Sequence, residues 1–342
     1  MDVDSLQENY TANKSATIQE GRVLWIDVMR GICILLVVLG HSIGDINDPL
    51  NRFILSFHMP AFFFLSGLCA KNVDVPIGVF IRRKVSTILV PQIVLAVINI
   101  IWLVIFERYS ISADKIIDAL FSWFLIVLFM VSILYYALDK LKIIEHKAIC
   151  IIVTIAVITL IDYLNIKTAI HIEIVPMALL FYLIGNYSKG LFESIVDKKW
   201  MNVLIVFLIP CVVMGSYWNK PVAMYLNQYG NLLLFFACAL AGILMLSYIS
   251  QRNQQNFFLQ WLGQNSIIIY IFHFKLLNLL HGIGVRLFPR IAGKTYAYPA
   301  HWHFFVLALL IIIPIVLVCN RWLPFLFGHK RSTLFLNKQN KK

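Results

Sequence analysis

The sequence predicts an all-α, polytopic membrane protein with about ten transmembrane helices and both termini in the cytoplasm. Of its 342 residues, 60% are hydrophobic and only 13% are charged, whereas a soluble protein is about half apolar and about a quarter charged. Ten apolar stretches approach or exceed the roughly 20 residues that a helix needs to cross a bilayer. They lie at 23–43, 53–70, 85–106, 117–138, 147–164, 172–188, 200–218, 230–250, 262–288 and 303–327.

The second and fifth stretches are short, and the second contains Pro60. We therefore expect the second to be irregular, which a membrane protein tolerates only where the backbone is buried among other helices.

Lysine and arginine are distributed unevenly between the connecting segments. The segments placed in the cytoplasm carry 18 of them and the segments placed outside carry 8. Because cytoplasmic loops are enriched in these residues, this asymmetry sets the orientation, and an even number of spans then puts both termini in the cytoplasm. The net charge of +12 mostly reflects the same asymmetry. Basic residues scattered over short loops argue against nucleic-acid binding.

Three parts of the chain are expected. Residues 1–22 form a polar cytoplasmic tail, because they lack the basic start and apolar core of a cleavable signal peptide. Residues 23–327 form the membrane domain, and residues 328–342 form a basic cytoplasmic tail. All six cysteines lie in apolar segments without metal-ligand spacing, so that neither a metal site nor a disulfide is expected.

Arg30 and His41 lie in the first stretch, with ten residues between them. A charged side chain inside a span costs roughly 2.5–3.5 kcal/mol on insertion scales and usually marks a functional site. Eleven steps of about 100° come to about three turns, so both side chains project from nearly the same helix face, roughly 16 Å apart along the axis. Gly31 and Gly40 leave room for a neighbouring helix or a ligand.

Two carboxylates are placed to support this pair. Asp27 precedes Arg30 by three residues and can pair with it, and Asp45 lies one turn after His41 and can orient its imidazole. Histidine, with a pKa near about 6.5 in water, is well suited to take a proton from a hydroxyl at neutral pH. The alternative is a structural Asp–Arg pair and a histidine at the membrane interface.

His58 stands two residues before Pro60 in the second stretch, where its polar ring must find partners. His41 and His58 both lie near the outer ends of adjacent helices, so they could sit close together across the short outer loop. His58 could equally be a satisfied buried histidine that holds the bend at Pro60.

Arg82, Arg83 and Lys84 are three adjacent cations at the cytoplasmic end of the third stretch. Arginine can grip phosphate in a bidentate way and lysine adds a point charge. Ordinary positive-inside topology or contact with anionic lipid explains such a cluster as well.

Tyr270 and His273 lie three residues apart in the ninth stretch and face the same way. Asn265 or Ser266 can cap the helix that carries them. This polar face could close a cavity opposite the first helix or form a structural hydrogen-bonding seam. Trp123, at the outer start of the fourth stretch, is more typical of an interface anchor than of a ligand contact.

In order along the chain, these motifs resemble the acyltransferase-3 family of integral-membrane O-acyltransferases, in particular its fucose-4-O-acetylase-like branch. The family's hallmark is a basic residue, ten positions and then a histidine, as at Arg30 and His41. The matching runs are Ile26-Asp27 to Arg30-Gly31, Leu39-Gly40-His41-Ser42, Phe57-His58-Met59-Pro60 to Ser66-Gly67, the cluster at Arg82, Trp123-Phe124-Leu125, and Gly263-Gln264-Asn265-Ser266 to His273. Together they cover residues 23 to 327.

The resemblance implies transfer of acetyl from acetyl-CoA to a hydroxyl of a cell-surface or lipid-linked carbohydrate, in a bacterial cytoplasmic (inner) membrane. It implies that His41 is the general base and Arg30 its basic partner. It also implies that Arg82, Arg83 and Lys84 bind the donor's phosphates. In this scheme the pantetheine arm passes along the Arg30 side and presents the thioester near His41.

One departure from the family concerns the basic cluster. Many members carry Arg-x-x-Arg after the second helix, whereas Val85 and Ser86 stand here, so the adjacent pair Arg82-Arg83 must substitute.

Several alternatives stay open at this point. A polytopic exporter of a glycan or small molecule also fits ten spans with buried charges, although transporters often contain paired repeats that are not evident here. A catalytically silent assembly or sensor protein is a third possibility. For an enzyme, the acceptor could be O-antigen, capsule, exopolysaccharide, a lipid-linked sugar or a secreted antibiotic. The acyl group, the choice between direct transfer and an acyl-histidine relay, and the oligomeric state are open as well.

Overall fold

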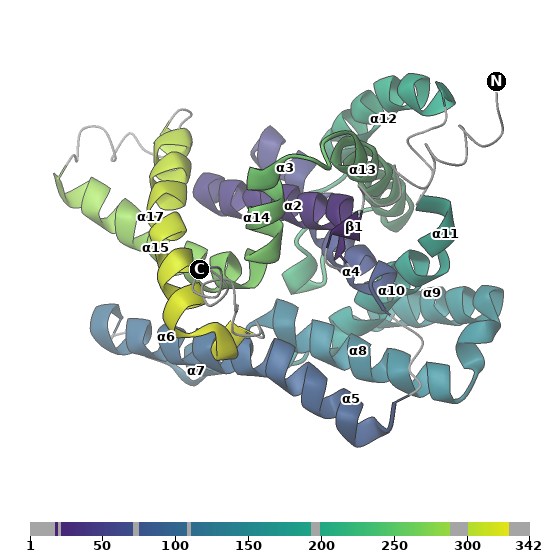
Figure 1. Ribbon diagram of the computed structural model, residues 1–342, viewed down its shortest axis with the longest axis horizontal. Helices are drawn as coiled ribbons and strands as arrows, with labels where there is room; N and C mark the ends of the chain where they lie inside the picture. The colour runs from purple at the N-terminus through teal and green to yellow at the C-terminus, as the bar shows by residue number, and fades with distance from the viewer. Residues whose placement is uncertain are drawn as a thin grey trace, which may run out of the picture. The chain divides into compact units, whose positions relative to one another are not determined.

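The computed structural model describes residues 18–19, 22–70, 75–107, 111–192, 199–287 and 300–327, which are almost entirely helical (Figure 1). Eight helices in this part of the chain are long and apolar enough to cross a membrane. They are α2 (Leu24–Ile43), the continuous run of α5 and α6 (Ile77–Phe106), α8 (Trp123–Lys140), α9 (Lys147–Leu164), α12 (Lys199–Trp218), α13 (Leu232–Arg252), α15 (Ser266–Leu287) and α17 (Ala300–Trp322). The predicted class, an all-α polytopic membrane protein, is thereby confirmed.

The remaining elements are short. The helices are α3 (Pro49–Leu55), α4 (His58–Leu68), α7 (Ala113–Leu120), α10 (Val175–Tyr187), α11 (Lys189–Phe192) and α14 (Phe257–Gln264). Two two-residue strands, β1 (Ile18–Gln19) and β2 (Arg22–Val23), pair antiparallel just before α2. Residues 328–342 and most of residues 1–22, the two predicted tails, lie outside the described residues.

Two of the ten expected stretches form helices shorter than a full span. The stretch 172–188 becomes α10 with a 3₁₀ turn before it. The stretch 53–70 is divided between α3 and α4, and the break falls at Ser56 and Phe57 rather than at Pro60. Pro60 lies in the first turn of α4, where its missing N–H needs no partner and its fixed φ suits the helix.

The helix that carries the basic cluster starts earlier than the apolar pattern predicts. It begins at Ile77, and a π-helical turn at 85–89 joins α5 to α6. Pro91 follows directly in α6 and cannot donate a backbone hydrogen bond to the preceding turn, which loosens the regular ladder there. The hydroxyls of Ser86 and Thr87 both donate to the carbonyl of Arg83, at 3.0 and 2.9 Å.

The fourth expected stretch, 117–138, is also divided. Its first residues belong to α7, and α8 begins only at Trp123. The side chain of Gln92 in α6 donates to the carbonyl of Leu120 (2.8 Å), and Asn99 donates to that of Ala119 (3.3 Å). These two amides satisfy carbonyls that the end of α7 leaves without helical partners.

The chain divides into two compact units. The first contains the described residues up to Cys69, together with Phe181–Met224 and Gln228–Ser266. In this unit α2 packs against α4, α13 and α14, and α12 packs along α13 (Figure 1). The most apolar window of α2 is 56% buried, the largest share among the eight candidate spans.

Glycines allow α2 and α14 to touch backbone to backbone. A Cβ at Gly31 would overlap the carbonyl of Leu259, and a Cβ at Gly263 would overlap the carbonyl of Asp27. Small residues of this kind let membrane helices approach closely. The room expected beside Gly31 is therefore filled by a neighbouring helix.

The second unit comprises Ala70–Leu180, Tyr225–Asn227 and Ile267–Lys342. Within it α6 packs on α7, α5 packs on α8, and a 3₁₀ turn at Pro324–Phe327 contacts both α6 and α17. Only 17% of the apolar window of α9 is buried, so most of this helix presents aliphatic side chains outward, as a lipid-facing helix does.

Candidate active site

Arg30 and Asp27 form the ion pair that their spacing predicts. Asp27 is buried (4% exposed), and its Oδ1 lies 3.4 Å from Nη1 of Arg30. The other carboxylate oxygen, Oδ2, accepts a hydrogen bond from Nε2 of Gln264 at 3.1 Å. A buried carboxylate needs such partners to offset the loss of hydration. Gln264 comes from α14, and spacing along α2 could not identify it as the third member of this cluster.

The guanidinium of Arg30 is only partly enclosed. Its side chain is 32% exposed, and Nη2 lies 3.1 Å from the sulfur of Cys69, which follows the end of α4. A guanidinium has five N–H donors, so these contacts leave hydrogen-bonding capacity for a further ligand. Cys69 is another contact that the linear spacing did not reveal.

His41 lies in the last turn of α2 and is exposed. The helix ends two residues later, where Gly44 adopts a positive φ of 75° and its N–H donates to the carbonyl of Gly40. Asp45 consequently no longer follows the helical spiral. Its carboxylate accepts hydrogen bonds from the backbone and side-chain amides of Asn47, at 2.8 and 3.2 Å. Asp45, expected from helical spacing to orient His41, directs its carboxylate to Asn47.

His58 is buried (6% exposed) at the start of α4 and lies within electrostatic range of His41. The predicted neighbourhood of these two imidazoles is therefore present. Nδ1 of His58 lies 2.8 Å from the carbonyl oxygen of Ile54. Because a carbonyl oxygen only accepts, Nδ1 carries the proton in this hydrogen bond, which leaves the lone pair of a neutral ring on Nε2.

Asn51 is a residue of this region that the sequence analysis missed. It is 3% exposed, its amide Nδ2 donates to the carbonyl of Asp45 (2.8 Å), and its Oδ1 faces Gly40, directly before His41. Asn51 thereby holds α3 against the C-terminal end of α2. The side chain of Arg52 donates to the carbonyl of Tyr217 (2.6 Å) at the end of α12, which ties the same short helix to a third element.

The basic cluster ends α5 in the second unit. Arg82 and Arg83 are exposed, while Lys84 is half-buried with Nζ 5.5 Å from the ring centroid of Phe80. The ring of Phe80 packs on that of Tyr136 in α8 with centroids 4.6 Å apart. Nζ of Lys140, also from α8, lies 5.8 Å from the Tyr136 ring. A fourth cation, Lys140, thus lies over the same ring pair as Lys84.

Tyr270 and His273 lie in the second unit, on α15. His273 is 2% exposed, and its Nδ1 lies 2.7 Å from the carbonyl oxygen of Tyr270. The Tyr270 ring contacts Phe124 of α8 edge-on, with centroids 5.3 Å apart. Asn265 donates from Nδ2 to the carbonyl of Trp261 (2.7 Å) and so serves the end of α14. The Tyr270 ring packs α15 against α8 within the second unit.

A further polar cluster, not predicted, joins α6 to α7. Glu107 accepts hydrogen bonds from Nζ of Lys115 (2.8 Å) and Nε1 of Trp102 (3.2 Å), and Nζ of Lys275 lies 5.3 Å from the Trp102 ring. The hydrogen bond from Lys115 holds the pKa of the Glu107 carboxyl below its usual value. These contacts tie the end of α6 to the start of α7.

Among the residues that the structure describes, no group of three or more His, Cys, Asp or Glu side chains could hold a metal ion. The six cysteines are free thiols.

Comparison with known protein families identifies a match over most of the chain. Residues 23–321 match the family model described as an acyltransferase domain. No curated protein and no solved structure matches significantly.

Proposed function

The chain belongs to the acyltransferase-3 family and is a multi-pass membrane acyltransferase, and from this premise we propose that it is an O-acetyltransferase. The donor is acetyl-CoA and the acceptor is a hydroxyl of a cell-surface or lipid-linked carbohydrate, in the bacterial cytoplasmic membrane. His41 acts as the general base.

The observation that carries this proposal is the arrangement on α2. An exposed imidazole, His41, and a partly exposed guanidinium, Arg30, project from one helix, about 16 Å apart along its axis. Asp27 pairs with the guanidinium and is itself held by Gln264, while His58 lies within electrostatic range of the imidazole. The α2 backbone holds the two side chains at a fixed separation, so that one position on the helix can contact the donor and the other can contact the acceptor.

The proposed reaction is a direct acyl transfer. The acceptor oxygen attacks the carbonyl carbon of the thioester while an unprotonated ring nitrogen of His41 takes the hydroxyl proton. The carbon–sulfur bond breaks, the thiolate of CoA leaves, and the proton on His41 passes to that sulfur. General base catalysis of this kind contributes roughly 10²–10⁴-fold to a rate. An acyl-histidine relay would use the same residue.

The cations of α5 suit the donor's phosphates. Arg82 and Arg83 are exposed and carry planar guanidinium groups, which bind phosphate oxygens in a bidentate way. Lys84 and Lys140 add charge on the Phe80–Tyr136 ring pair.

The test is acyl transfer by membranes that contain the full chain. Membranes with matched expression receive isotopically labelled acetyl-CoA and envelope polysaccharide, and acetyl incorporation is followed by mass spectrometry. His41→Ala should lower the rate by roughly 10²–10⁴-fold. His303→Ala is the matched control, because His303 is also exposed near the end of a candidate span, and it should retain the rate.

Full transfer by His41→Ala would refute the assignment of the base. Uptake of a substrate into vesicles without any acyl incorporation would instead identify a transporter.

A further inference from the structure

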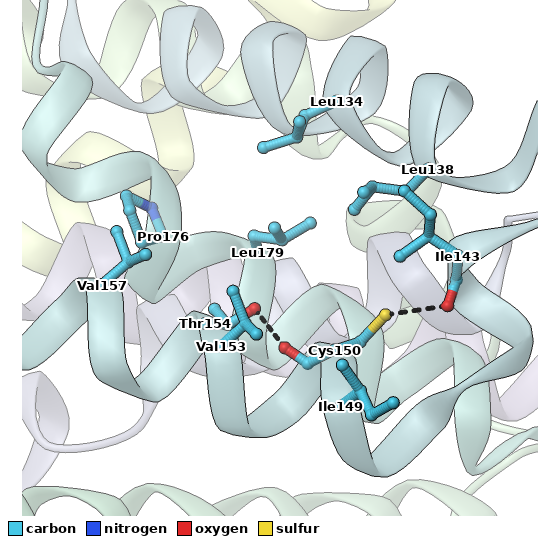
Figure 2. A pocket seen from close by; sticks show the side chains of 10 residues that line it. All are labelled: Leu134, Leu138, Ile143, Ile149, Cys150, Val153, Thr154, Val157, Pro176 and Leu179. Carbon is cyan, nitrogen blue, oxygen red and sulfur yellow. Dashed lines mark hydrogen bonds between the residues drawn. The ribbon is translucent and has the colours of Figure 1, made fainter. Parts of the chain in front are cut away.

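An apolar groove of about 240 Å³ lies between α8, α9 and α10 in the second unit (Figure 2). Aliphatic side chains from all three helices line it, among them Leu134, Val157 and Leu179. Two polar side chains also line the groove, and both are internally satisfied. Thr154 donates to the carbonyl of Cys150 (2.6 Å), and the thiol of Cys150 donates to the carbonyl of Ile143 (3.2 Å). The lining therefore suits a hydrocarbon and offers little to a polar ligand.

The groove opens along the outward face of α9. Ile149 and Val153, which line it, are 57% and 54% exposed. Because α9 is long and apolar enough to span a membrane, an opening on its exposed apolar face suits contact with lipid hydrocarbon. From Ile149 to Val157 the groove follows α9 for about 12 Å, at about 1.5 Å per residue. This length suits part of one fatty acyl chain that lies along the helix.

Positive charge gathers at one end of the groove, where α8 ends and α9 begins. Lys142 directly precedes the lining residue Ile143, and Lys147 stands two residues before Ile149. With Lys140 they make three exposed cations, against the acidic Asp139 and Glu145 in the same segment. This end therefore carries a net positive charge and complements an anionic headgroup.

We infer that the groove binds an anionic phospholipid. One acyl chain occupies the space between α8, α9 and α10, and the phosphate lies against Lys142 and Lys147. Anionic lipids of the cytoplasmic leaflet attract basic segments at the membrane surface, and these lysines lie in a loop whose charge predicts a cytoplasmic position. A bound lipid adds packing to α9, which has few contacts of its own, and stabilises the fold by mass action.

The experiment measures lipid binding by the full chain after delipidation in a neutral detergent. Native mass spectrometry follows titrations with phosphatidylglycerol and with phosphatidylcholine. The unmodified protein should bind phosphatidylglycerol more tightly. Val153→Trp fills the groove and should weaken binding of this lipid at least tenfold. Ile152→Trp is its control, because Ile152 is 65% exposed on the same helix and does not line the groove.

Charge is tested separately. Lys142→Gln with Lys147→Gln should weaken phosphatidylglycerol binding by about fivefold for each lysine and leave phosphatidylcholine binding unchanged. Lys167→Gln with Lys220→Gln removes two exposed lysines elsewhere and should have no effect. These are surface changes, so the charge test stands even where Val153→Trp fails to fold. Equal affinity for the two lipids, or undiminished binding after either the groove or the lysine change, would overturn the inference.

Discussion

The contact between α2 and α14 predicts a destabilising effect for a substitution that ordinarily stabilises a helix. Alanine in place of a helical glycine gains about 0.5–1 kcal/mol from backbone entropy. At Gly31, however, the new Cβ would overlap the carbonyl of Leu259. That atom is backbone, so no rotamer change can relieve the overlap, and α14 must move by more than an ångström. Overpacking of this kind costs about 1–3 kcal/mol, so Gly31→Ala should be net destabilising by about 1–2 kcal/mol.

Gly282 provides the matched control. It also lies inside a spanning helix, α15, but a Cβ there would have no neighbour within 4 Å. Gly282→Ala should therefore stabilise by the propensity gain alone, so the two substitutions are expected to change the free energy of unfolding in opposite directions. Apparent melting temperatures of the purified variants in one detergent measure the difference.

The rate of acyl transfer should also depend on the contact between α2 and α14. Movement of α14 carries Gln264 away from Asp27 and so loosens the cluster that holds Arg30, which predicts slower acyl transfer by Gly31→Ala. Gly263→Ala separates the same two helices, because its Cβ would overlap the Asp27 carbonyl. The double variant should accordingly cost less than the sum of the two single changes. A stabilised Gly31→Ala protein, or strictly additive effects of the two glycine changes, would contradict the backbone contact.

Three further predictions concern charged groups. Arg82→Ala combined with Arg83→Ala should raise the KM for acetyl-CoA with little change in kcat, and an unchanged KM in initial-rate measurements would assign the pair to topology alone. Asp27→Ala should lower the free energy of unfolding by about 1–3 kcal/mol, because it removes the hydrogen-bond acceptor of Gln264 in α14 and the ion-pair partner of Arg30. An unchanged melting temperature would contradict this. The pKa of Glu107 is lower in the folded protein than in the unfolded chain. Its contribution to the free energy of unfolding is therefore fully present above the unfolded-state pKa and is lost as the pH falls through the folded-state pKa. Glu107→Gln should therefore flatten the acid limb of the stability profile, by about 0.2–1 kcal/mol for a pair as exposed as that with Lys115, and an unaltered acid limb in melts across this pH range would disprove the link.

Contacts within one helix were the most predictable part of the candidate site. The pairing of Asp27 with Arg30 follows from three residues of helical spacing, and the structure contains it. His58 also lies within electrostatic range of His41, as expected, although the short helix α3 stands between the two helices that carry them. Helical spacing does not extend to Asp45, since Gly44 ends α2 with a positive φ before the next turn can form and the Asp45 carboxylate binds Asn47.

Helix boundaries were less predictable than helix existence. Apolar runs continue through the breaks at Ser56 and Phe121, so hydropathy alone joined segments that the backbone separates. Pro60 was expected to mark the irregularity, but a proline in the first helical turn is tolerated and breaks nothing. The break at Ser56 coincides with the C-terminal cap of α3. The break after α7 coincides with the side-chain amide of Gln92, which donates to the carbonyl of the last residue of that helix.

The sequence by itself determined the membrane class, the helical periodicity that puts Arg30 and His41 on one face, and the order of motifs shared with the family. These properties depend on composition and on spacing along a single helix, where the geometry of the backbone leaves little choice. Only the tertiary structure decided which distant residues lie beside the candidate groups of each unit, namely Gln264 beside Asp27 and Asn51 beside Gly40 in the first unit, and Lys140 on the same ring pair as Lys84 in the second. Those partners depend on which helices pack together, and in α2 and α14 that choice follows from a backbone contact that Gly31 and Gly263 make possible.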